Sequence, residues 1–194
     1  MIHKTGRLLL AFIFLFFFAG CGDEEDGDLP GNGYDMPDPG EFEAGVTGDI
    51  ERDLQGTALF DMMVDQDTGD TFFILNLSTN ETPTNNMWFS KGWARPSTGS
   101  YQVQDLDPDD LDDSWAPGED RFAFLFIDDP DGNMALVLSD GGEVEISRSR
   151  EDEVAGEFII QATGFYLTDL NTVLEVEVRG AFNAIVGEVQ LPEL

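Results

Sequence analysis

Apolar side chains recur with a period of two along most of the chain after residue 44, and this pattern constrains the fold most strongly. It is clear in Val144-Glu145-Ile146-Ser147 and in the run VLEVEV over 173–178. A period of two is that of a β-strand with one buried face, and no long stretch has the helical period of 3.6. Runs that are apolar throughout, such as Phe122 to Ile127, are typical of strands covered on both faces. The sequence therefore predicts an all-β domain.

Turn signals separate these segments. Clusters of Asp, Gly, Pro and Asn at 65–70, 128–133 and 140–142 lie between apolar runs, as they do between antiparallel strands. We predict ten strands, at 45–51, 55–64, 71–78, 86–91, 100–104, 121–127, 134–139, 143–149, 153–163 and 172–186, the last bent at Gly180. Eight to ten antiparallel strands in a domain of this length form a β-sandwich or a β-barrel, and we slightly favour the sandwich.

The first 20 residues have the three zones of a secretory signal. Two basic residues precede an uninterrupted apolar run over 8–18, which is too short to span a bilayer about 30 Å thick as a helix. The run ends in Phe18-Ala19-Gly20-Cys21, which resembles the lipobox of bacterial lipoproteins, although Leu is commoner than Phe at its first position. This resemblance implies that residues 1–20 are removed, that Cys21 becomes the acylated N-terminus, and that Gly22 favours the outer membrane. A plain signal peptide or a short anchor is the alternative.

An acidic segment follows the cysteine. Between residues 22 and 43 there are nine Asp and Glu, three Pro and no basic residue. Such a segment buries too little apolar surface to offset its ordering entropy, and its charge and proline extend it. We therefore predict a disordered tether over 21–43 and an all-β domain over 44–194.

Three segments of the second half resemble a pattern in uncharacterised bacterial lipoproteins with a secreted all-β domain. They are a G-x-V-x-I strand beginning at Gly142, the run Val154-Ala155-Gly156-Glu157-Phe158, and a closing V-x-G-x-F-x-A strand over 178–184. The turn Pro96-Ser97-Thr98-Gly99-Ser100-Tyr101 is similar to a P-x-x-G-x-Y turn of the same proteins. The resemblance implies a secreted β domain and supplies no catalytic residue.

The charge and the scarcity of reactive side chains exclude several functions. The chain has 40 Asp and Glu against 9 Lys and Arg, a formal net charge of -31. A surface of this sign repels nucleic acid and anionic headgroups. The single histidine, His3, and the single cysteine, Cys21, belong to the signal and the lipobox, so Ser-His-Asp and Cys-His catalysis and Cys/His zinc sites are not expected. Adaptation to high salt, where screening weakens self-repulsion, is the favoured origin of the charge; generic acidity and cation binding are the alternatives.

Two acidic loops have carboxylates at spacings that calcium sites use. Asp65, Asp67 and Asp70 flank Gly69, and a denser loop contains Asp105, Asp107, Asp109, Asp110, Asp112 and Asp113. Neither loop fits the EF-hand pattern, since the denser loop has Asp110 where glycine is required and Ala116 where glutamate is required. A hairpin turn and a solvated acidic loop are the simpler interpretations. If calcium binds, we expect it at the denser loop.

Trp88, Lys91, Trp93 and Arg95 form the only local group of cations and aromatic rings. An indole beside a hydrogen-bond donor suits stacking on a sugar ring or holding an acidic ligand. The simpler interpretation is that Trp88 packs in the core and that Lys91-Gly92 makes a turn.

These observations favour a non-catalytic envelope lipoprotein with an interaction or structural role. A carrier of small apolar ligands inside a barrel is the first alternative, because the predicted strands are rich in phenylalanine and ligand pockets are mostly apolar. An open apolar cavity would favour that carrier, whereas interdigitated phenylalanines would argue against it. A calcium-dependent binding or adhesive module is the second alternative. No enzymatic activity or organic cofactor is expected.

Overall fold

The computed structural model describes residues 33–64, 69–80, 85–106, 120–128 and 134–189. Contacts divide the chain into two compact units, Met1–Pro30 and Gly31–Leu194. The second unit contains nine strands in the described residues: β1 (Glu41–Gly48), β2 (Arg52–Val64), β3 (Thr71–Thr79), β4 (Asn86–Gly92), β5 (Gly99–Val103), β6 (Arg121–Asp128), β7 (Ala135–Ser149), β8 (Glu153–Tyr166) and β9 (Asp169–Val186). Within the described ranges, no helix is long and apolar enough to cross a membrane.

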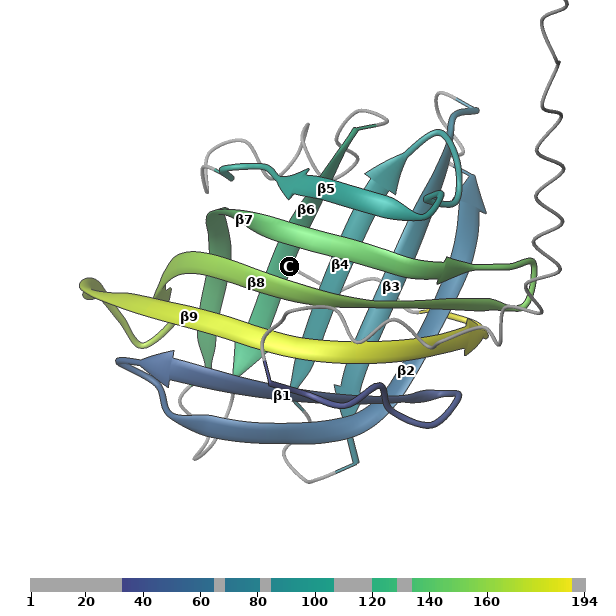
Figure 1. Cartoon of the computed structure of the whole chain (residues 1–194). Coiled ribbons are helices and arrows are strands. Elements are labelled where there is room, and N and C mark those ends of the chain that lie inside the picture. Colours follow the sequence, from purple (N-terminus) through teal and green to yellow (C-terminus); the bar gives the residue numbers. More distant parts are fainter. Residues whose placement is uncertain (1–32, 65–68, 81–84, 107–119, 129–133, 190–194) are drawn as a thin grey trace, which may run out of the picture. The chain divides into compact units, whose positions relative to one another are not determined.

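The nine strands form one sheet that closes into a barrel, so the predicted all-β fold is confirmed. Neighbours follow the order β1-β2-β3-β4-β6-β5-β7-β8-β9, and β1 closes the ring by pairing with β9. Most pairs are antiparallel as predicted, but β2 with β9 and β5 with β6 are parallel. Figure 1 shows two crossing layers, with β1, β9, β8, β7 and β5 in front and β3, β4, β6 and the later part of β2 behind. The barrel is therefore flattened and retains a sandwich-like core.

Two boundaries differ from the sequence prediction. β1 begins at Glu41, and Phe42 is only 1% exposed. The end of the predicted tether over 21–43 therefore belongs to the β domain. The predicted strands 134–139 and 143–149 are one strand, β7, which pairs with β8 along its length and has an irregularity between Ser139 and Gly141. A β-bulge changes the strand's direction here without ending it.

Glycines allow the strands to approach closely where the barrel curves. A Cβ added at Gly56 would lie 2.2 Å from the carbonyl oxygen of Ser78, and one at Gly156 would lie 2.2 Å from that of Glu145. Neither distance can be relieved by rotating a side chain, because the colliding atom belongs to the backbone. Glycine kinks of this kind are how curved sheets close.

Phenylalanine rings fill the interior of the barrel. Nine of them are almost completely buried in one cluster: Phe42, Phe60, Phe73, Phe89, Phe122, Phe124, Phe126, Phe158 and Phe182. The ring centroid of Phe89 in the back layer lies 5.0 Å from that of Phe158 in the front layer. Phe89 also contacts Phe124 at 4.9 Å. Rings of the two layers therefore interdigitate across the interior.

A second apolar cluster covers the outer face of the back layer. It contains Phe72 and Ile74 of β3, Trp88 of β4 and Leu125 of β6. Leu106, which follows β5, and Val189, near the C-terminus, pack onto it and are themselves buried. This explains why β3 and β6 are apolar on both faces, as the sequence predicted for strands covered on two sides, and β4 shares this environment.

Candidate functional site

The predicted group of Trp88, Lys91, Trp93 and Arg95 does not form one site. Trp88 is 6% exposed and belongs to the outer apolar cluster, whereas Lys91 alternates with Met87 and Phe89 on the inner face of β4. Side chains three positions apart in a strand point to opposite faces. Trp88 therefore packs in an apolar core, as the simpler interpretation predicted.

Lys91 is buried near the end of β4, so the predicted turn at Lys91-Gly92 is wrong: both residues belong to the strand, and the chain bends after them. Its Nζ lies 5.6 Å from the ring centroid of Tyr101 and donates to the carbonyl oxygens of Gly92 and Ala94 at 3.4 and 3.5 Å. The hydroxyl of Tyr101 in turn donates to the carbonyl oxygen of Ser97 at 2.9 Å. These contacts give the ammonium group an aromatic face and backbone acceptors. They indicate that Lys91 stabilises this end of the barrel.

Asp128 is the counterpart of Lys91 at the other end. It ends β6, which is antiparallel to β4, and it is 1% exposed. Its Oδ1 lies 3.7 Å from Nε of Arg52 in an ion pair. Among the described residues, Lys91 and Asp128 are the buried charged side chains. The buried phenylalanine cluster therefore has a buried charged side chain at each end of the barrel.

Trp93 is the member of the group that reaches solvent most fully. It is 58% exposed and has a φ of 73°, which is unusual for a residue other than glycine. Its backbone N–H donates to the carbonyl oxygen of Thr71 at 2.8 Å, which holds the turn after β4. Arg95 is half-buried. Only Trp93 and part of Arg95 are thus presented for a ligand.

The calcium prediction falls mostly outside the described residues. Asp105 is exposed just after β5, but Asp107, Asp109, Asp110, Asp112 and Asp113 lie outside the described ranges, as do Cys21, Asp65 and Asp67. In the part of the chain that the structure describes, no three His, Cys, Asp or Glu side chains are grouped to hold a metal ion. Calcium binding at the denser loop stays a prediction.

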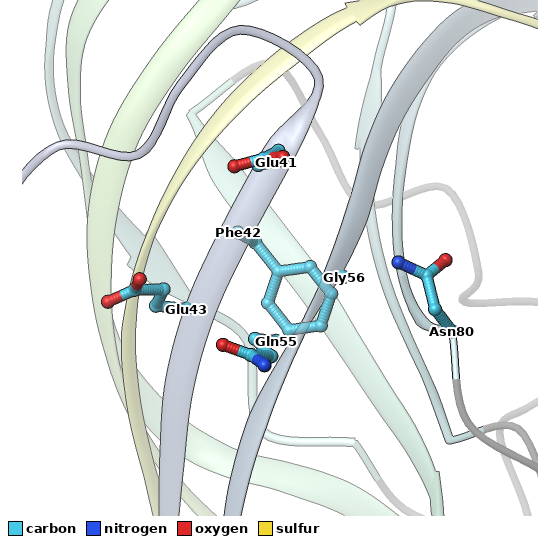
Figure 2. A pocket seen from close by; sticks show the side chains of 6 residues that line it. All are labelled: Glu41, Phe42, Glu43, Gln55, Gly56 and Asn80. Carbon is cyan, nitrogen blue, oxygen red and sulfur yellow. The ribbon is translucent and has the colours of Figure 1, made fainter.

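A polar groove on the outer side of β1 and β2 was not predicted. Two adjoining depressions of about 230 and 370 Å³ share Glu43 and Gln55 in their walls. Glu41 and Glu43 alternate with the buried Phe42 along β1, and in Figure 2 the Glu43 carboxylate points to the opposite side of the strand from the Phe42 ring and Asn80. Carboxylates and amides of this kind suit a hydrated polar partner, and they offer no nucleophile with an adjacent base.

Tyr34 closes one side of this groove. Its Oη occupies the space beside Gly45, where an added Cβ would lie 2.5 Å away. Burial, followed by the charges of Asp53 and Glu43, raises the pKa of Tyr34, while Arg179 opposes the shift. The segment before β1 is therefore packed against the barrel. The sequence did contain a signal for this, since Phe42, Ala44 and Val46 continue the period-two pattern into the predicted tether.

No protein-family model, curated protein or solved structure matches this chain.

Proposed function

We propose that this protein is a non-catalytic envelope lipoprotein that acts through the outer surface of a solid β-barrel. The observation that carries this proposal is the interior filled by nine buried phenylalanines. A domain whose interior is filled can contact partners only through its outer surface. Among the described residues, the outer surface along β1 and β2 is polar and acidic.

The aromatic contacts argue against a carrier of small apolar ligands. Such a carrier needs a cavity of several hundred cubic ångströms lined by apolar groups. Here Phe89 lies within 6.4 Å, between ring centroids, of Phe122, Phe124 and Phe158. The rings thus occupy the space that a bound ligand would need, and we do not propose this activity.

The N-terminal sequence supports attachment to a membrane through lipid. Gly33, the first described residue, lies twelve positions after Cys21, so the start of the described β domain would lie within about 40 Å of an acylated cysteine, at ~3.3 Å per residue. Acyl chains contribute about 0.8 kcal/mol per buried CH₂, and two or more hold a protein firmly. The outer membrane, with the barrel displayed at its surface or in the periplasm, is the proposed location.

Expression of the full chain in a Gram-negative host tests this proposal, with Cys21→Ser as the matched variant. We expect the parent chain to fractionate with outer membranes and to require detergent for release, and the variant to appear in the soluble fraction. Metabolic labelling with an alkyne fatty acid should label the parent chain only. A parent chain that is unlabelled and soluble would refute lipid anchoring.

A further inference from the structure

The end of the β8–β9 hairpin, which comprises the turn and the first residues of β9, presents apolar side chains to solvent. Leu167 is 49% exposed, Leu170 is 67% exposed and Val173 is 65% exposed. This turn lies at the left edge of the molecule in Figure 1, where β9 extends beyond the end of β1. Isolated exposed apolar residues are common, but three within seven positions at the end of one hairpin form a local feature.

The conformation of this tip is defined by hydrogen bonds. The N–H of Leu167 donates to the carbonyl oxygen of Met134 at 2.8 Å. The pairing of Phe165 with Val173 and of Tyr166 with Asp169 leaves residues 170–172 as an irregularity in the ladder. The carboxylate of Asp169 accepts from the backbone N–H of Asn171 at 3.2 Å and from the hydroxyl of Thr172 at 2.8 Å. Leu170 is therefore held outward at the irregular start of β9.

The end of the β8–β9 hairpin is also poorer in acidic residues than the chain as a whole. Residues 159–174 contain one acidic residue, Asp169, whereas the whole chain has 40 acidic residues in 194. The hydrogen bonds from Thr172 and Asn171 lower the pKa of Asp169, so its carboxylate stays ionised and limits how deeply the tip can enter an apolar medium. The tip is suited to shallow contact with an apolar surface.

We propose that the β8–β9 tip, formed by Leu167, Leu170 and Val173, inserts shallowly into the surface of the lipid bilayer to which the chain is tethered. That the chain is attached to this bilayer rests on the proposed function. Three side chains form too small an area for a stable protein–protein interface, which needs about 1,200 Å². A weak apolar contact is sufficient when a tether keeps the local concentration of the bilayer high.

The length of the tether permits this contact. Tyr34 lies beside Gly45, which pairs with Arg179 of β9. From Arg179 to Leu170, β9 runs nine residues, about 30 Å at ~3.3 Å per residue. Gly33, the first described residue, lies twelve positions after Cys21, and this stretch can span up to about 40 Å. A bilayer that holds Cys21 is thus within reach of the tip.

The test uses the chain from residue 21 onward, coupled through Cys21, its only cysteine, to a maleimide lipid in phosphatidylcholine vesicles. An environment-sensitive fluorescent amino acid replaces Leu170, and the same probe at Val186, which is 56% exposed at the other end of β9, is the matched control. The buffer contains 2 M KCl, since the Debye length is already only about 3 Å at 1 M salt and shortens further with added salt, so repulsion by the acidic surface is screened.

We expect a blue shift and quenching by brominated lipid for the probe at position 170, and neither effect at position 186. Leu167→Ser should lower the ratio of inserted to water-exposed probe about tenfold, as expected for the loss of one buried leucine. A probe that stays in water at position 170, or a shift that appears without vesicles because two copies associate, would overturn the proposal. If cells acylate the full chain but the probe at the tip stays in water, the tip proposal fails and the proposed function stands. If the tip inserts but cells do not acylate the chain, the lipid anchor alone is refuted.

Discussion

Replacement of Phe89 by alanine should destabilise the barrel severely. Phe89 is completely buried, and its ring contacts Phe122, Phe124 and Phe158. Truncating a buried phenylalanine costs about 3–5 kcal/mol, because transfer free energy is lost and a cavity remains. Native domains are stable by only about 5–15 kcal/mol, so we expect Phe89→Ala to remove a large part of the free energy of unfolding.

Urea denaturation in 2 M KCl, followed by circular dichroism, measures this loss. With a urea dependence of about 2 kcal/mol per molar for a domain of this size, a loss of about 4 kcal/mol lowers the midpoint by about 2 M. Val186→Ala, at an exposed position of β9, is the control and should change stability by less than about 0.5 kcal/mol. A loss below about 1 kcal/mol for Phe89→Ala would refute the filled interior and would restore the carrier as a candidate function.

A double-mutant cycle locates the contact between the layers. Phe89 belongs to β4 and Phe158 to β8, and their ring centroids lie 5.0 Å apart. Aromatic pairs are coupled by about 0.5–1.5 kcal/mol beyond the area that they bury. We expect a coupling in this range between Phe89→Leu and Phe158→Leu. Strict additivity would mean that the two layers are not packed together at this point.

Three further predictions test the curvature, the buried cation and the surface ion pair. Gly156→Ala should lower the free energy of unfolding by more than about 2 kcal/mol, because the added carbon would meet a backbone oxygen at 2.2 Å. Gly69→Ala meets nothing within 4 Å and should lower it by only about 1 kcal/mol, because of the φ of 77° at that position. Equal losses of stability in urea denaturation would contradict this prediction. Lys91→Met should cost about 1–2 kcal/mol and Trp93→Ala less than about 0.5 kcal/mol, and the reverse order would mean that Lys91 is not structural. Arg179 lowers the pKa of Glu177, chiefly by donating a hydrogen bond to its carboxylate. The small stabilisation from this ion pair is present above the ordinary carboxyl pKa and is lost as pH falls through the lowered pKa of the folded state. Glu177→Gln should therefore lower the urea midpoint at pH 7 and leave it unchanged near pH 2.

Most strands could be predicted because each carries its own local signal. The β3 and β6 segments are apolar runs bounded by clusters of turn-forming polar residues, and their observed bounds are within one residue of the predicted ones. The strand order could not be predicted, because β5 reaches its place between β6 and β7 through pairings between residues far apart in sequence. The sequence at Gly141-Gly142 predicted a turn, because a glycine in a hairpin turn cannot be distinguished by sequence from a glycine that lets a continuous strand bend.

The candidate site was harder to predict than the fold. Trp88 and Lys91 are close in sequence and rich in chemistry, but their odd spacing within a strand already places them on opposite faces. This geometric rule outweighs proximity along the chain. The groove around Tyr34, Glu43 and Asp53 was missed because acidic composition suggested a tether over residues now seen to pack on the barrel. Composition describes the average of a segment, whereas a single buried ring such as Phe42 marks where the β domain begins along the chain.

Native mass spectrometry of the protein released from host membranes detects the lipid anchor and the filled interior in one measurement. We expect a chain that begins at residue 21, that is heavier than its sequence by covalent acyl groups, and that has the same mass under native and denaturing conditions. A chain of unmodified mass would contradict the lipid anchor. An additional apolar ligand that is present in the native spectrum and lost on denaturation would contradict the solid barrel.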